Sequence, residues 1–387
     1  MTVFISQFSL FSGDISNATH NPPTIAIKDT IDIAGYPTTA ASRALAGAPP
    51  ASRHADVVKN VLDAGWHIIG KANMHELAFG MTGINDFTGT PRNPQDPTCI
   101  PGGSSSGSAS AVGLKLVDAA LGTDTGGSIR GPAACCGVIG LKPTFGRVSR
   151  VGVAPRESSL DCVGPFARDM RTLVAAMAAI EPAFDTGAAD IWKSPVKVAC
   201  VSVQADTGIR EAVQDAVYQV DAHARIIELA LLNEAFEAGL AVINAETSRA
   251  FGHLAGTGQL GADLEARLRL AAATTSAQLE AAERVRRDFT AAVDHALADV
   301  DVLVMPTLPA LPITVEAARN GTPVIAMSSL IRPFNLSGHP ALSLPISVAG
   351  SPLKAGLQIV GRKGADEMVC AIAARFEAAL LLAAADA

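Results

Sequence analysis

The stretch PGGSSSGSAS, residues 101–110, raises the question on which the fold depends. Runs of glycine and serine commonly form flexible linkers between domains. Here, however, short apolar runs follow at 111–114 and 117–121, and such runs are typical of buried segments. A second glycine-rich stretch, GTDTGGSIR, comes next at 122–130. We therefore interpret residues 101–130 as part of a folded core rather than as a linker.

Strand-like and helix-like patterns alternate on both sides of this stretch. An amphipathic pattern closed by Gly65 predicts a helix over 54–64, and a second helix is predicted over about 105–116. This alternation of strands and helices implies an α/β fold. The predicted strands, read from apolar runs bounded by turn residues, lie at 24–27, 66–69, 117–121, 138–141 and 302–305, with further strand signals at 340–348 and 356–360.

The chain reads as one domain, residues 1–387, because no internal repeat and no low-complexity linker divides it. Its first part, about 24–165, holds the glycine-rich stretches. The middle, about 206–299, is alanine-rich and almost wholly helical in pattern, and we interpret it as an excursion from the domain. The last part, about 300–387, returns to strand patterns and ends in an apolar run from 369 that predicts a docking helix.

Composition argues against several classes of protein. Hydrophobic residues make up 49% of the chain, but Arg375, Glu377 and Asp386 interrupt the longest apolar run, so no membrane span is predicted. The net charge is −7 without a basic stripe, which argues against a nucleic-acid partner. The N-terminal sequence lacks the features of a secretory signal, so a cytoplasmic protein is expected. The six cysteines show no CxxC pair and no metal-ligand spacing, which predicts reduced, buried thiols.

Other motifs that could carry chemistry are weak. Residues 65–71 match the G-x-x-x-x-G-K phosphate loop, but Ala72 stands where a serine or threonine would hold magnesium, and the segment reads as a strand. No HExxH motif is present, so zinc hydrolysis has no support. His75 and His339 lie outside any strong motif, and we interpret both as structural. We expect neither a metal nor an organic cofactor.

Serine and lysine remain as candidate catalytic residues. A serine hydroxyl is a poor nucleophile until a base takes its proton, and a lysine can be that base when it is neutral. The lysine pKa, ordinarily about 10.4, must then fall by roughly 3 pH units, which burial and a neighbouring cation can achieve. Lys28 follows the apolar run 24–27, where a strand could carry it inward, although a surface lysine fits equally well. Likewise, Gly126-Gly127-Ser128 is either a simple turn or a nest of converging N–H groups, which would form an oxyanion hole.

Taken together, these segments resemble the amidase signature family. Upstream, AIKD at 26–29 resembles the lysine motif of that family, and GTPRNP at 89–94 resembles the segment before its signature. The resemblance runs over nearly the whole chain. Its signature segments are PGGSSSGSA at 101–109, GTDTGGSIR at 122–130 and GLKPT at 140–144, and its downstream landmarks are DCVGP at 161–165, MPT at 305–307 and FNLSGHPAL at 334–342.

The resemblance implies the amidase signature fold, a single α/β domain with a central mixed β-sheet covered by helices on both faces. It also implies a Ser–cis-Ser–Lys triad. In this triad Ser128 matches the nucleophile, Ser104 matches the bridging serine and Lys28 matches the base. We predict that the Gly103–Ser104 peptide bond is cis, because the bridging hydroxyl has to face both Lys28 and Ser128.

The glycine-rich segment around the nucleophile is also given roles by the resemblance. Asp124 and Arg130 flank the nest, and we expect them to support the loop because buried charges generally need partners. A solvated turn carrying two charges is the alternative. The backbone N–H groups that match the oxyanion hole are those of Thr125, Gly126, Gly127 and Ser128.

The implied activity is hydrolysis of a small-molecule carboxamide to a carboxylate and ammonia or an amine, through an acyl-enzyme. The compact stretch between Pro165 and Met305 favours a stand-alone hydrolase, similar to malonamidases and indoleacetamide hydrolases. The transamidosome A-type amidotransferase subunit, which acts with partner subunits on charged tRNA, is one alternative. A hydrolase of carbamate- or urea-type amides and a non-catalytic scaffold are others. No nucleic-acid or membrane partner is expected, and a homodimer is left open.

Overall fold

The computed structural model describes residues 2–13 and 21–385. The strands of this part form one mixed sheet in the order β1-β3-β2-β4-β6-β5-β10-β11-β9-β7-β8. β2 runs parallel to β3 and β4, whereas β4–β6 and β10–β11 are antiparallel pairs. The strands are β1 Phe4–Leu10, β2 Thr24–Lys28, β3 His67–Ala72, β4 Ala119–Asp124, β5 Ile139–Lys142, β6 Cys162–Ala167, β7 Val198–Val201, β8 Arg225–Ile227, β9 Val302–Pro306, β10 Ala341–Ser347 and β11 Lys354–Val360.

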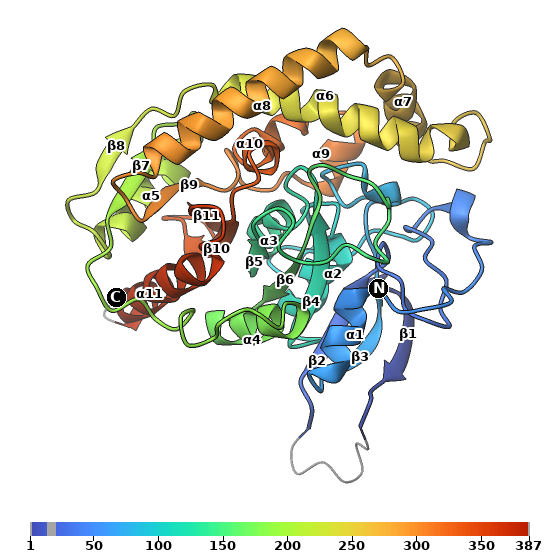
Figure 1. The fold of residues 1–387 in the computed structure, drawn as a ribbon, viewed down its shortest axis with the longest axis horizontal. Helices are drawn as coiled ribbons and strands as arrows, with labels where there is room; N and C mark the ends of the chain where they lie inside the picture. Colours follow the sequence, from blue (N-terminus) through green and yellow to red (C-terminus); the bar gives the residue numbers. More distant parts are fainter. Residues whose placement is uncertain (1, 14–20, 386–387) are drawn as a thin grey trace.

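Helices cover both faces of the sheet (Figure 1). Side chains of α1, α4, α5 and α11 form one apolar cluster against one face. On the other face, α2 and α3 pack against the N-terminal strands, and the paired helices α6 and α8 pack with α10 against the C-terminal strands. The helices are α1 Asp56–Asp63, α2 Ser106–Gly113, α3 Arg130–Cys136, α4 Met170–Ile180, α5 Thr207–Tyr218, α6 Leu232–Phe251, α7 Ala262–Ala271, α8 Ser276–Ala296, α9 Val315–Arg319, α10 Arg332–Leu336 and α11 Asp366–Ala385.

Alternation along β2 decides where its lysine lies. Ile25 and Ile27 belong to the apolar cluster beneath α1 and α4, whereas Ala26 packs on the opposite face with residues of α2. Because successive side chains of a strand point to opposite faces, Lys28 lies on the same face as Ala26. The strand therefore carries Lys28 inward, where its side chain is fully buried.

Much of the serine-rich stretch at 101–110 folds into helix α2. Residues 106–112 of this helix are all buried, so small side chains are needed on every side of it. A Cβ at Gly107 would lie 2.4 Å from the Asn73 carbonyl oxygen, which shows how closely the backbone after β3 approaches. Ser108 Oγ donates to the Leu121 carbonyl at 2.9 Å and ties the helix to β4. Tertiary packing thus offsets the weak helix propensity of serine and glycine.

The structure confirms the predicted α/β fold with a mixed sheet, and it also corrects details of the element prediction. The predicted helix over 105–116 ends at Gly113, and the strand expected at 117–121 begins at Ala119 and continues to Asp124. The region 206–299 is mostly helical, as predicted, but it contains the short strand β8. Strands β1, β6 and β7 and helix α3 were not predicted from the sequence.

Two compositional expectations can be compared with the described residues. None of the described helices is long and apolar enough to cross a membrane. All six cysteines are free thiols, and five are buried while Cys200 is half-buried. Burial raises the Cys200 pKa to about 11, so this thiol stays protonated at neutral pH.

Candidate active site

Lys28 and Ser104 meet in the interior, although they lie far apart in the sequence. Lys28 Nζ donates hydrogen bonds to Ser104 Oγ at 2.7 Å and to Thr123 Oγ1 at 2.8 Å. Lys28 and Ser104 are each 0% exposed. The contact places the amine that ends β2 against the hydroxyl that precedes α2, which is the pairing that the motifs predict.

The electrostatic environment of Lys28 suits a proton acceptor. Burial lowers the pKa of Lys28 to about 7, and it outweighs the opposing influence of the carboxylates of Asp161 and Asp124. No carboxylate of the described residues lies within ion-pair distance of Lys28. A substantial fraction of the amine is therefore neutral near pH 7, as a general base requires.

The backbone around Ser104 is fixed on both sides. The Gly103–Ser104 peptide bond is cis, which confirms the prediction. The His75 N–H donates to the Ser104 carbonyl at 3.0 Å, and the Ser105 N–H donates to the Ser128 carbonyl at 3.2 Å. The second bond joins the segment that holds the bridging serine directly to the loop that holds Ser128.

Most of the predicted oxyanion loop has its N–H groups available. Within the described residues, the N–H groups of Thr125, Gly126 and Ser128 have no hydrogen-bond acceptor. Gly127 differs from the prediction, because its N–H donates to Asp124 Oδ1 at 2.8 Å and is already satisfied. Its backbone has a φ of +113°, and a Cβ there would lie 2.1 Å from Ile331 Cδ1, so only glycine fits.

Asp124 and Arg130 form a fully buried ion pair beneath this loop. Arg130 Nε and Nη2 donate to the two Asp124 oxygens at 3.0 and 2.9 Å. All five guanidinium donors of Arg130 have partners, since Nη1 donates to Gln358 Oε1 and the Ile331 carbonyl and Nη2 also donates to Asn335 Oδ1. The pair is therefore a hydrogen-bonded support and not a solvated turn.

Asp124 is held as a carboxylate by this network. Burial acts to raise its pKa, but the charge of Arg130 and hydrogen bonds from Arg130 and Asn335 outweigh that effect and hold the pKa well below its usual range. The carboxylate also accepts from the backbone N–H groups of Ile129 and Arg130, at 3.1 and 3.3 Å. One side chain thus fixes the loop on both sides of Ser128.

Ser128 opens onto a cavity of about 210 Å³. Its walls are mostly apolar and include Met81, Leu240 and Ile243. A larger cavity of about 850 Å³ adjoins it and shares Arg267, Val324 and Ile325, but Ser128 does not line this second space. The small cavity therefore lies at the candidate nucleophile, and the large one forms a polar vestibule beside it.

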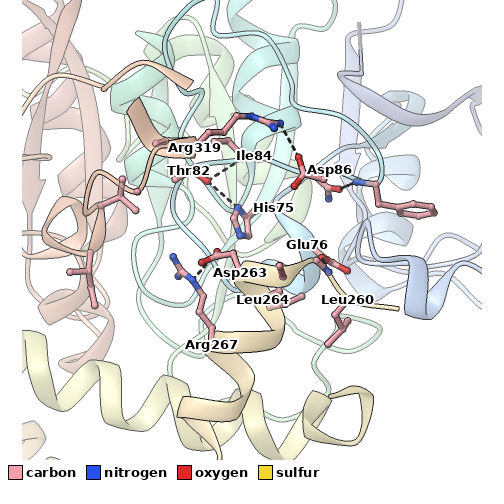
Figure 2. Close-up of a pocket in the computed structure, with 18 of the residues that line it drawn as sticks. His75, Glu76, Thr82, Ile84, Asp86, Leu260, Asp263, Leu264, Arg267 and Arg319 are labelled. Atoms are coloured by element: carbon pink, nitrogen blue, oxygen red, sulfur yellow. Dashed lines mark hydrogen bonds and ion pairs between the residues drawn. The ribbon is translucent and has the colours of Figure 1, made fainter. Parts of the chain in front are cut away.

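The two histidines named in the sequence lie outside the Lys28–Ser104 pair. His75 lines the vestibule and contacts Thr82 Oγ1 at 3.4 Å (Figure 2). His339 bonds to Ser337 Oγ and Asp294 Oδ1, both at 3.0 Å. Burial lowers the pKa of each histidine to about 4, so neither is a base matched to neutral pH.

The segment that resembles a phosphate loop is part of the sheet. Residues 67–72 form β3, and the Lys71 ammonium pairs with Asp29 Oδ1 at 2.8 Å. A lysine held in this way inside a strand cannot reach a phosphate, so the motif match is accidental. Among the described residues, no group of three or more His, Cys, Asp or Glu side chains is placed to hold a metal ion.

Thr123 is the site residue that the sequence interpretation missed. It lies in the same GTDTGGSIR stretch as Ser128, and its hydroxyl is the second acceptor of the Lys28 amine. The only sequence signal was its place in that motif, because a threonine near the end of a strand has no chemistry of its own to announce. Asp161, which accepts from Thr125 Oγ1 at 2.8 Å, was likewise seen only as part of a landmark segment.

The fold and this arrangement agree with a known family. A family model described as Amidase matches residues 23–370. The chain therefore belongs to the amidase family, whose members carry the amidase signature. Enzymes of this family cleave C–N amide bonds, so this protein is an amide-hydrolysing enzyme.

Individual relatives extend over nearly the whole chain. The A-type subunit of glutamyl-tRNA(Gln) amidotransferase from Methanospirillum hungatei JF-1 is 33% identical over 405 residues, which cover 92% of this chain and 92% of the relative. The crystal structure of an amidase superposes with a TM-score of 0.83 at 31% identity, covering 92% of this chain and 84% of that one. A structure described as a vestigial complex that reveals the origins of an s-triazine catabolic enzyme gives 0.86 at 27% identity, with coverage of 92% and 84%.

Proposed function

We propose that this protein hydrolyses small-molecule carboxamides to a carboxylate and ammonia or an amine, with Ser128 as nucleophile, Ser104 as bridging residue and Lys28 as base. The observation that carries the proposal is the fully buried Lys28, whose pKa is lowered to about 7 by burial and whose amine lies 2.7 Å from Ser104 Oγ. A buried lysine without a carboxylate partner is costly in a merely structural role, and it suits a group that must lose its proton.

In the proposed reaction, neutral Lys28 takes the proton of Ser104 while Ser104 takes the proton of Ser128. The Ser128 oxygen forms a bond to the amide carbonyl carbon, and the carbonyl electron pair moves onto its oxygen. The unpaired N–H groups of Thr125, Gly126 and Ser128 are placed to donate to that oxyanion. Because Gly127 donates to Asp124, we leave it out of the oxyanion hole.

The tetrahedral intermediate then collapses with cleavage of the C–N bond. The proton held by Lys28 returns through Ser104 to the departing nitrogen, which leaves as ammonia or an amine. Water, deprotonated by the same relay, attacks the acyl-enzyme and releases the carboxylate. Thr123 keeps the amine of Lys28 oriented in both halves of the reaction, since it accepts from Nζ at 2.8 Å.

The amidotransferase subunit remains a second candidate because of the relative from Methanospirillum hungatei. Such a protein transfers ammonia within a complex instead of serving as a stand-alone hydrolase. The compact stretch between Pro165 and Met305 supports the stand-alone hydrolase. Co-purification with two other subunits, together with glutaminase-coupled amidation, would instead support the amidotransferase.

An ammonia-release screen tests the proposal. The purified protein is incubated with aliphatic, aryl and ureido amides, and ammonia is measured in a coupled assay beside the Ser128→Ala variant. We expect release from at least one class without added subunits, no release by the variant, and labelling of Ser128 by a fluorophosphonate in the wild type alone. Absence of both release and labelling would contradict the proposal, and a response to ureido amides alone would assign a urea-type substrate.

A further inference from the structure

The cavity at Ser128 has an uneven distribution of charge. Two of its lining residues are arginines, Arg267 and Arg332, and none of its lining residues in the described part of the chain is an aspartate or a glutamate. Arg267 is already paired, because its Nε lies 3.0 Å from Asp263 Oδ2 within α7 (Figure 2). The excess positive charge of the cavity therefore resides on Arg332.

Arg332 has few partners for a buried guanidinium. It is 5% exposed, and within the described residues no carboxylate lies in ion-pair distance of it. Its Nη2 donates to Ser328 Oγ at 2.6 Å and its Nη1 makes a long contact of 3.4 Å with the Phe236 carbonyl. Its Nε is buried without an acceptor among the described residues. The contrast is Arg130, equally buried, all five of whose donors are satisfied.

The surroundings hold the Arg332 side chain against the candidate oxyanion loop. Its Cζ lies 4.3 Å from the centre of the Phe236 ring, and a Cβ at Gly239 would lie 2.9 Å from its Cγ. On the other side, a Cβ at Gly126 would lie 3.6 Å from Arg332 Nε. The guanidinium is thus wedged between α6 and the segment that precedes Ser128.

The charge of Arg332 is costly in this position. Burial lowers its pKa to about 10, an effect that the nearby charge of Glu237 opposes and that of Arg267 reinforces. A buried cation without a counterion is stabilised when a ligand supplies the missing anion. A carboxylate is well matched to this guanidinium, because it can accept more than one N–H at once.

We propose that Arg332 binds a carboxylate on the acyl part of the substrate, so that the preferred substrates are small amides with an anionic group, such as monoamides of short dicarboxylic acids. This inference rests on the proposed function and narrows its substrate class. The acyl part carries the anion because the ammonia released from a primary amide has none. The volume of about 210 Å³ and the apolar walls fit a short carbon chain between the two polar ends.

The test compares substrates that differ only in charge. Malonamate, succinamate and glutaramate are paired with propionamide, butyramide and valeramide, in which a methyl group replaces the carboxylate. We expect the wild type to favour at least one carboxylated member over its partner by about tenfold or more in kcat/KM, which equals about 1.4 kcal/mol. In Arg332→Met, which keeps the packing of the stem, that ratio falls to near one, and in Arg332→Lys part of it remains.

Two controls keep the outcomes separate. Arg249→Met removes an exposed arginine of α6 that lines neither cavity, and the substrate ratio should stay at its wild-type value. Binding of the same amides to Ser128→Ala is measured by calorimetry, which needs no turnover and is repeated with the Arg332 variants, whose folding is checked by thermal melting.

Each outcome bears on one of the two proposals. Equal kcat/KM for charged and neutral partners in the wild type would overturn the role of Arg332 while leaving amide hydrolysis intact. A preference that survives in Arg332→Met would overturn it as well and would assign the charge selectivity to Arg267. If neither series is cleaved, the proposed function is contradicted, and equal affinities of Ser128→Ala for succinamate and butyramide would then also overturn the role of Arg332. If Arg332→Met does not fold, the wild-type ratio and the Arg332→Lys ratio decide.

Discussion

Substitution of Lys28 by arginine, combined with a pH profile of the wild type, tests the proposed relay most directly. Only neutral Lys28 can accept a proton, so kcat/KM should follow the neutral fraction of the amine. With a pKa of about 7, set by burial, that fraction rises from about one-tenth at pH 6 to about nine-tenths at pH 8. We expect kcat/KM to rise about tenfold over this interval and then to level off.

An unperturbed lysine predicts a different curve. With its ordinary pKa near 10.4, about one lysine in 3,000 is neutral at pH 7, and activity would keep rising about tenfold per pH unit through pH 9. His75 and His339 cannot produce a limb near pH 7, because burial lowers their pKa values to about 4. The position of the limb therefore separates the buried amine from both alternatives.

The arginine variant fixes the charge permanently at this position. Arginine stays protonated at any usable pH, so Lys28→Arg should lose at least about a thousandfold in kcat/KM, or about 4 kcal/mol. Lys28→Met is the matched neutral control and should be equally inactive, since it also lacks a base. Ammonia release is measured from pH 5 to 9, and circular dichroism verifies folding. Retention of more than about a tenth of wild-type kcat/KM by Lys28→Arg would refute the relay.

Further substitutions test the other members of the site. Ser128→Ala should abolish turnover with the circular dichroism spectrum unchanged, and wild-type kcat would rule this residue out as the nucleophile. Ser104→Ala should retain more ammonia release than Ser128→Ala, because water can stand in for the bridging hydroxyl; the opposite order would contradict the relay. Thr123→Val should lower kcat about tenfold and move the basic limb to lower pH, since the charged amine loses an acceptor; an unchanged profile would leave Thr123 a packing role. Asp124→Asn should lower the free energy of unfolding in urea by about 3–5 kcal/mol because Arg130 stays buried without its counterion, and Arg130→Lys should lose less; unchanged stability and rate would contradict the support role.

The parts of the fold that follow from local pattern were predictable. β2 and β9 are short apolar runs bounded by polar or turn residues, and α1 is amphipathic and closed by a glycine. These signals depend only on neighbours in the sequence. β6 was missed because its residues, Cys162–Ala167, include a glycine and a proline, and its strand conformation comes from pairing with β4.

The site followed the same division. Lys28, Ser104 and Ser128 could be assigned because their motifs are long and ordered, although composition alone left each ambiguous. The bond from Gly127 to Asp124 could not be foreseen, since it depends on the side-chain conformation of a buried aspartate. Neither could the incomplete hydrogen bonding of Arg332, because its neighbours Phe236 and Ser328 are brought to it only by packing of α6 and α10.

The network beneath the Ser128 loop has a consequence for how the enzyme is made. Arg130 bonds to Asn335 and Gln358, which follow it in the sequence by 205 and 228 residues. During synthesis the loop is therefore complete as a sequence long before the side chains that hold it have left the ribosome. β10 and β11 also have to enter the middle of the sheet, between β5 and β9. A nascent chain thus acquires its reactive centre only in the last stage of translation, when nearly the whole protein is present to surround it.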